Sequence, residues 1–129
     1  MKERIEAEVA LIRRFYLNAE YHEAGWIRIP DYRLPEGIWN QTVIEVLAQF
    51  PIPGYPGQAP YGIHVRPCLR LKGLQMPTNY TEPVGTPFGD NWGKFSWQPE
   101  GWRPTADLYS GSNMLDFIRT FIDRFREVT

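Results

Sequence analysis

Few side chains in this 129-residue sequence suit a specific chemistry by type and spacing alone. Cys68 is the one cysteine, and His22 and His64 are the two histidines. One thiol excludes an internal disulfide, and three such ligands are too few for a standard closed zinc site. The sequence also has no Gly-x-Ser-x-Gly elbow, no phosphate-binding glycine loop and no paired-histidine motif. These residues therefore predict neither a bound metal nor a cofactor.

Two of these side chains have both a structural and a catalytic interpretation. Cys68 is the only thiol nucleophile, but it stands beside Leu69 just after a predicted strand. A buried free cysteine behaves as a small hydrophobic residue, and we favour that role. His64 lies between Ile63 and Val65 in the same strand, so a structural or solvent-facing histidine is favoured over a catalytic one.

The middle of the chain has an unusual composition. Residues 51–104 hold 10 of the 12 prolines, 8 of the 11 glycines and three of the five tryptophans. Disordered segments contain few apolar and few aromatic residues, so the tryptophans of this segment argue against disorder. We therefore expect a long, ordered loop, and a long ordered loop in a small domain is usually functional.

The two ends of the sequence have the periodicity of amphipathic helices. A helix over residues 2–17 is predicted from apolar residues at i, i+4, i+7 and i+11, namely Ile5, Val9, Ile12 and Tyr16. A second helix is predicted near the C-terminus from Leu115, Ile118, Ile122 and Phe125. Ser110 or Ser112 can cap this second helix.

Alternating apolar residues predict three strands, over residues 26–29, 42–50 and 61–65. The apolar face of the second strand is expected to face the core; it consists of Ile44, Val46, Ala48 and Phe50. Helix, strands, long loop and helix together predict an α+β fold, with the helices packed on an antiparallel β-meander. A length of 129 residues and the absence of a linker indicate a single domain over residues 1–129.

In the middle region, the segments Phe50–Pro60 and Gly93–Pro104 carry motifs that resemble those of ubiquitin-conjugating enzymes. Phe50–Pro60 is similar to the family's Phe-Pro, Tyr-Pro and Pro-Pro crossing between strands. Gly93–Gln98 and Trp102–Pro104 resemble the active-site strip, Gly-x-Ile-Cys-Leu-Asp followed by Trp-Ser-Pro. Ser96 falls at the position of the catalytic cysteine, and Thr86–Phe88 falls at that of His-Pro-Asn.

Three features further resemble the bacterial branch called prokaryotic family E. They are the crossing over Tyr55–Pro60, the Leu69–Leu71 tripeptide and the Phe95-Ser96 pair. About twenty residues, 66–85, are additional to the usual pattern, and Phe88 replaces its asparagine. The resemblance spans nearly the whole chain and implies a ubiquitin-conjugating-like (UBC-like) fold.

The resemblance implies an acyl transfer at Ser96. A conjugating enzyme accepts the activated C-terminus of a ubiquitin-like protein on its nucleophile and passes it to an amine. A hydroxyl is a weaker nucleophile than a thiolate, so positioning and oxyanion donors must contribute. We expect the site to be lined by Asp90, Asn91, Trp92, Trp97 and Trp102. Asp90 is favoured as the base over Asp107, although either can be a turn acceptor; Asn91 can replace the missing asparagine or serve in a turn.

The resemblance also implies partners. An activating-enzyme-like protein would dock on the N-terminal helix, where Lys2, Arg13 and Arg14 either contact it or form a solvated face. A ubiquitin-like protein, a protein target and a deubiquitinase-type peptidase complete the expected pathway. A net charge of −1 argues against nucleic-acid or membrane binding, and the charged N-terminus favours a cytoplasmic protein. The alternative function is a catalytically inactive adaptor that binds a ubiquitin-like protein or a target.

Overall fold

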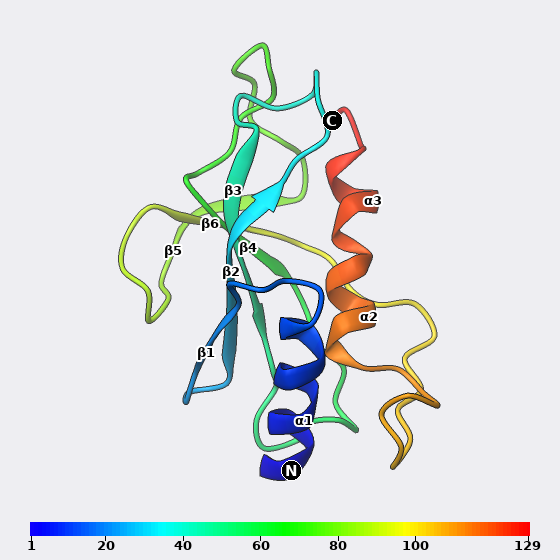
Figure 1. The fold of residues 1–129 in the computed structure, drawn as a ribbon. Helices are drawn as coiled ribbons and strands as arrows, with labels where there is room; N and C mark the ends of the chain where they lie inside the picture. The colour runs from blue at the N-terminus through cyan, green and yellow to red at the C-terminus, as the bar shows by residue number, and fades with distance from the viewer.

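A computed structural model of residues 1–129 shows one six-stranded antiparallel sheet with helices on one side of it (Figure 1). The helices are α1 (Lys2–Arg13), α2 (Met114–Arg119) and α3 (Phe121–Phe125). The strands are β1 (Glu20–His22), β2 (Trp26–Arg33), β3 (Val43–Gln49), β4 (Ile63–Arg66), β5 (Tyr80–Val84) and β6 (Trp92–Phe95). This architecture confirms the predicted α+β fold class.

The first four strands follow one another as a meander, but the last two do not. The sheet order is β1-β2-β3-β4-β6-β5, so β6 pairs with β4 and leaves β5 at the edge. β5 lies within the additional residues 66–85 and, like β1 and β6, was not predicted. It contains Pro83 and a register shift between Thr81 and Val84. A proline cannot donate to a ladder, and an edge strand tolerates this.

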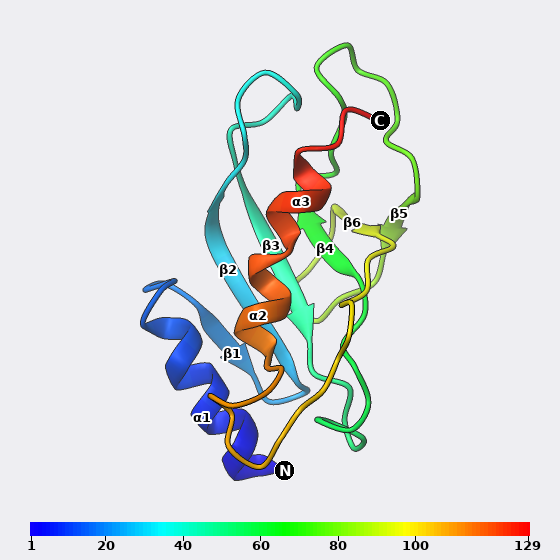
Figure 2. The same cartoon turned by 90° about the vertical axis from the view of Figure 1, so that its right-hand side faces the viewer.

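The core lies between the helices and one face of the sheet (Figure 2). The predicted apolar face of β3 is confirmed, since Ile44, Val46, Ala48 and Phe50 are all buried there. The helices cover it with apolar side chains three or four residues apart, which are Ile5, Val9 and Ile12 on α1 and Phe117, Phe121 and Phe125 on α2 and α3. Burying such side chains is worth roughly 1.5–3 kcal/mol each.

The helix ends differ from the prediction. α1 ends at Arg13 rather than at residue 17, and Tyr16 lies beyond it, with its ring 6.4 Å from that of Tyr32. The C-terminal helix is divided at Thr120, and its N-cap is Asn113, whose side chain accepts from the Asp116 N–H. Local hydrogen bonds and packing decided these ends, which the apolar periodicity does not encode.

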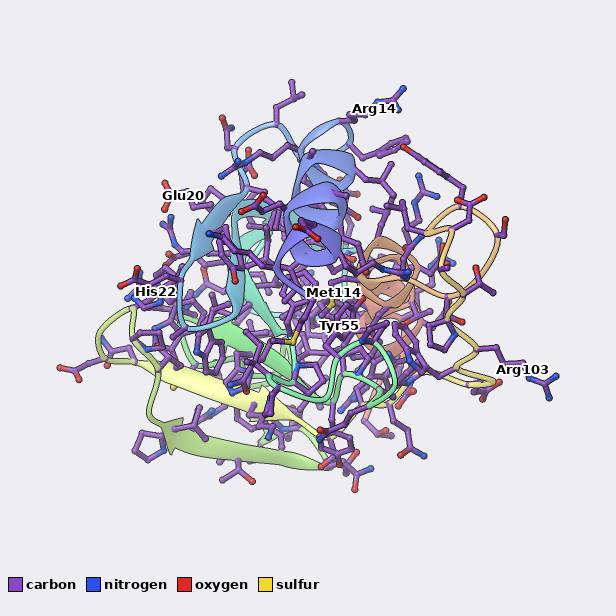
Figure 3. All side chains as sticks on the ribbon, turned by 90° about the horizontal axis from the view of Figure 1, so that it is seen from below. Arg14, Glu20, His22, Tyr55, Arg103 and Met114 are labelled. Atoms are coloured by element: carbon purple, nitrogen blue, oxygen red, sulfur yellow. The ribbon has the colours of Figure 1, made fainter.

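Glu8 joins three parts of the chain at the end of the core. Its carboxylate is fully buried and accepts from the Tyr55 hydroxyl at 2.6 Å, the Met114 N–H at 2.6 Å and the Arg4 Nε at 2.7 Å. Tyr55 belongs to the proline-rich crossing and Met114 begins α2; Figure 3 shows both next to one another near α1. The same Arg4 also donates to the carbonyls of Thr105 and Ser112.

The other face of the sheet carries a smaller cluster. Trp26, Leu47 and Trp92 pack together there, and the His64 ring lies edge-on to Trp26 at 4.9 Å. Ion pairs cross the neighbouring strands in the order Glu20, Arg28, Glu45 and Arg66. Leu47 is therefore buried, although the alternation within residues 42–50 predicts that it lies on the face away from the main core.

Glu8→Ala should destabilise the protein by about 3–5 kcal/mol, because it leaves buried donors of Tyr55, Arg4 and Met114 without an acceptor. Urea denaturation followed by tryptophan fluorescence measures the change. Glu6→Ala is the control, since Glu6 is exposed on the same helix, and its effect should stay within about 0.5 kcal/mol. Equal effects of the two changes would contradict the role of Glu8.

Protonation of His64 should destabilise the fold. Burial, and then the charge of Lys94, lowers the pKa of His64 to about 4, and its Nδ1 has no hydrogen-bond partner. Because the unfolded chain binds this proton near pH 6.5, stability should fall as the pH drops from about 6.5 to 4, by up to about 3 kcal/mol. His64→Leu should flatten this dependence. An NMR titration of the folded protein with a His64 midpoint near 6.5 would contradict it.

Candidate active site

A cleft of about 670 Å³ lies between the segment that follows β6 and the two C-terminal helices. Figure 2 shows this segment descending beside α2. Ser96, Trp97 and Trp102 line the cleft from the segment. Asp116, Thr120 and Asp123 line it from the helices, and Tyr61, Asn79 and Glu100 complete much of the wall. None of these last six residues was predicted as a site residue. All of them except Glu100 are at least 17 residues from Ser96 along the chain.

Ser96 is the first residue after β6. Its side chain is exposed, and its hydroxyl makes no hydrogen bond within the protein. Its backbone N–H donates to the Asn79 carbonyl at 2.9 Å, which continues the pairing of β5 with β6. The backbone of Ser96 is thus fixed at the cleft, and its hydroxyl is open to a reactant.

Trp97 and Trp102 each anchor one wall of the cleft. Trp97 donates from Nε1 to the Thr120 hydroxyl at 2.9 Å, where the C-terminal helix is divided. Trp102 donates from Nε1 to the Pro56 carbonyl at 2.8 Å, and its ring lies 6.0 Å from that of Tyr55. These contacts pack the proline-rich crossing against the strip that contains Ser96.

Three residues expected beside Ser96 lie elsewhere. Asp90 and Asn91 precede β6 and are exposed, whereas Ser96 follows the strand. An extended strand rises about 3.3 Å per residue, so Asn91 and Ser96 are roughly 16 Å apart. Trp92 is fully buried on the outer face of the sheet, with Arg66 over its ring at 4.6 Å. The structure does not bring these three residues to the cleft.

Asp107, the other carboxylate considered as a base, is an acceptor in an exposed turn. Its side chain accepts from the Tyr109 N–H at 2.9 Å and from the Ser110 hydroxyl at 2.8 Å. The Tyr109 N–H, and then Ser110, lower the pKa of this carboxyl. No carboxylate or imidazole is hydrogen-bonded to Ser96 in the free protein.

The three basic residues considered on the N-terminal helix lie at its two ends. Lys2 begins α1 and Arg13 ends it. Arg14, which is labelled in Figure 3, follows the helix. All three are exposed, and the Arg13 Nε donates to the Ala19 carbonyl at 3.0 Å. Twelve residues at 1.5 Å each separate the two ends by about 18 Å, so the three side chains do not form one patch.

Cys68 does not line the cleft. It is partly buried near Tyr80 and Glu82, and the neighbouring Leu69 N–H donates to the Tyr80 hydroxyl at 3.0 Å. Burial, and then a hydrogen bond with Glu82, raises the pKa of the Cys68 thiol. A raised pKa reduces the thiolate fraction, and the thiolate is the nucleophile.

No group of three or more His, Cys, Asp and Glu side chains lies close enough together to hold a metal ion. None of the helices is long and apolar enough to cross a membrane.

A proline-rich crossing packed beneath the strip after the last strand is an arrangement of the ubiquitin-conjugating, or E2-like, class. The family model of prokaryotic E2 family E matches residues 15–124, and the chain belongs to this family. No curated protein and no solved structure matches the chain. Membership indicates a ubiquitin-conjugating-like transferase role in bacteria, and interaction in general with ubiquitin-like proteins and activating enzymes.

The Cys68 thiol should react slowly with iodoacetamide at pH 7, because its raised pKa leaves little thiolate. Alkylation rates are measured by mass spectrometry over a range of pH. The pH at which the rate is half-maximal should be higher for Cys68 than for a cysteine peptide measured alongside. The urea-unfolded protein is the control and should match the peptide. A midpoint below that of the peptide would instead indicate an activated thiol.

Proposed function

We propose that this chain, as a single UBC-like domain over residues 1–129, is a ubiquitin-like protein transferase with a serine nucleophile. Ser96 accepts the C-terminus of a ubiquitin-like protein as an oxyester and passes it to an amine of a protein target. The observation that carries the proposal is the exposed Ser96 hydroxyl in the cleft, while the only thiol lies outside it.

Both steps of the proposed reaction are acyl transfers. In loading, the Ser96 Oγ attacks the carbonyl carbon of a thioester on the activating enzyme; the hydroxyl proton and the released thiolate give a thiol. In transfer, the amine attacks the ester carbonyl, the C–O bond to Ser96 breaks, and the serine hydroxyl is restored with a proton from the amine. An oxyester is less activated than a thioester, so positioning must supply much of the rate.

The walls of the cleft suit two reactants, the C-terminal tail of the ubiquitin-like protein and the amine of the target. Trp97 and Trp102 offer apolar faces to an extended C-terminal tail. Glu100, Asp116 and Asp123 line the same cleft, and none of them forms an ion pair within the chain. Carboxylates attract a cation at short range, which favours binding of a lysine side chain in its ammonium form. The ammonium group then loses a proton to solvent, and the neutral amine attacks the ester.

The remaining parts of the proposal concern the surroundings of the site. Asp90, Asn91 and Trp92 support the far end of β6, and Asp90 or Asn91 reaches Ser96 only if their loop moves. Lys2, Arg13 and Arg14 contact an activating-enzyme-like protein at one or the other end of α1. A deubiquitinase-type peptidase reverses the modification, and the pathway operates in the cytoplasm.

Loading is tested by mixing the protein with ATP, an activating-enzyme-like protein and a ubiquitin-like protein from the same organism. The expected adduct survives dithiothreitol and is cleaved by alkali, because it is an ester. Ser96→Ala should remove it, Ser96→Cys should make it sensitive to dithiothreitol, and Ser110→Ala should leave it unchanged. An alkali-labile adduct that persists in Ser96→Ala would contradict the proposal.

One observation favours the adaptor as a second function: no base is hydrogen-bonded to Ser96. An adaptor would bind the ubiquitin-like protein, as measured by isothermal titration calorimetry, and Ser96→Ala would bind it equally well. No covalent adduct would form in the loading reaction. The two functions therefore differ in whether an ester appears on gels and in intact-mass spectra.

A further inference from the structure

The residues that are additional to the family pattern place an asparagine beside Ser96. β5 pairs with β6 so that Tyr80 is opposite Phe95 and Thr81 is opposite Lys94. Asn79 is therefore opposite Ser96, and the 2.9 Å bond from the Ser96 N–H to the Asn79 carbonyl joins them. Both residues lie just outside the two strands, and this bond continues the pairing by one residue. Both residues line the same cleft.

The Asn79 side chain is free to act. It is exposed, and its amide makes no hydrogen bond within the protein. Its φ of 53° lies in the left-handed region, which asparagine adopts more readily than other residues with a side chain. A non-glycine residue in this region is a form of backbone strain that is concentrated at functional sites.

A buried arginine fixes the segment that carries Asn79. The Arg124 Nη2 donates to the Thr78 carbonyl at 2.8 Å, one residue before Asn79. The same guanidinium lies 4.6 Å from the ring centre of Phe95, one residue before Ser96. Arg124 thus holds the two chain segments together immediately behind the pair.

Tyr80 of β5 also fixes the pairing of β5 with β6. Tyr80 crosses over β6 at Gly93, where a Cβ atom would lie only 2.0 Å from the tyrosine hydroxyl. That hydroxyl donates to Glu82 at 2.7 Å and accepts from the Leu69 N–H at 3.0 Å. The glycine of the Gly-x-Phe-Ser strip therefore admits the side chain next to Asn79 and sets the register of β5 on β6.

The proposed reaction needs a donor at this place. Attack of Ser96 on a carbonyl produces a tetrahedral oxyanion, which preorganised N–H donors stabilise. Phe88 occupies the position at which the resembling motif has an asparagine, and it packs against Trp92 on the outer face of the sheet. A phenylalanine has no donor, and this one points into a different cluster.

We propose that Asn79 is a catalytic residue whose Nδ2 donates to the oxyanion formed on Ser96 in both loading and transfer. This inference rests on the serine transferase function proposed above. It assigns a chemical role to the residue that precedes β5: Asn79 supplies, from the neighbouring edge of the sheet, the amide that the loop before β6 does not supply.

Asn79→Gly tests the role with the backbone preserved, because glycine adopts a positive φ without strain. In the loading reaction under single-turnover conditions, the rate at saturating activating enzyme should fall about 10²–10³-fold. The concentration for half-saturation should change little. Discharge of a preloaded protein to free lysine should slow similarly, since the same oxyanion forms.

Two further variants separate the amide from its surroundings. Asn79→Asp has the same shape but brings a negative charge to the oxyanion, so it should lose at least as much activity as Asn79→Gly. Gln75→Ala removes an exposed amide from the same additional segment but outside the cleft, and it should change the rate less than threefold. Thermal unfolding of all three variants should match that of the unaltered protein within a few degrees.

The outcomes distinguish this inference from the function on which it rests. If the unaltered protein forms the Ser96 ester and Asn79→Gly forms it within threefold of the same rate, only the role of Asn79 is overturned. If Gln75→Ala loses as much rate as Asn79→Gly, the specific assignment to Asn79 is also overturned. If the unaltered protein forms no ester at Ser96, the transferase function fails, and the role of Asn79 fails with it.

Discussion

The carboxylate of Glu8 is where the N-terminal helix, the proline-rich crossing and the C-terminal helices are joined. A buried charge is costly unless donors surround it, and here a hydroxyl, a backbone N–H and a guanidinium do so. Tyr55 is fixed by this contact, and Trp102 then packs on the crossing beside it. One wall of the cleft therefore depends on a charge that lies outside the cleft.

Arg124 is a second buried charge and supports the opposite wall. Its guanidinium lies against the rings of Phe95 and Trp39 and donates to the carbonyls of Thr78 and Thr129. Burial lowers the pKa of this arginine, and an ion pair with Glu127 acts in the other direction. Polar contacts thus position the residues around Ser96, whereas the apolar core specifies the layers of the fold.

The layers could be predicted because short-range periodicity encodes them. Ile5, Val9 and Ile12 repeat at helical spacing, and the strand that became β3 alternates on a face that is buried as expected. β5 was missed because it is a short edge strand that contains Pro83. Its sequence lacks the alternation of apolar and polar residues that predicts a strand. The C-terminal helix was predicted without its division at Thr120, where a tertiary contact with Trp97 forms.

The site was harder to predict than the fold because sequence distance is a poor guide to spatial distance in strands. Asp90 and Asn91 are five or six residues from Ser96, yet an extended β6 separates them from it. Asn79 is seventeen residues away and is its direct partner, since strand register is a non-local property. Trp97 and Trp102 were expected in the site and do line the cleft, because no strand intervenes between them and Ser96.

The position of β5 at the sheet edge has a consequence for association between copies of the chain. An open edge presents unpaired backbone groups, and a flat one recruits further strands. In β5 the proline at position 83 removes one donor, and the register shift beside it bends the strand. This edge is therefore a poor template for pairing with a strand of another copy of the chain. Such pairing would cover the cleft beside β5, and the proline and the register shift oppose it.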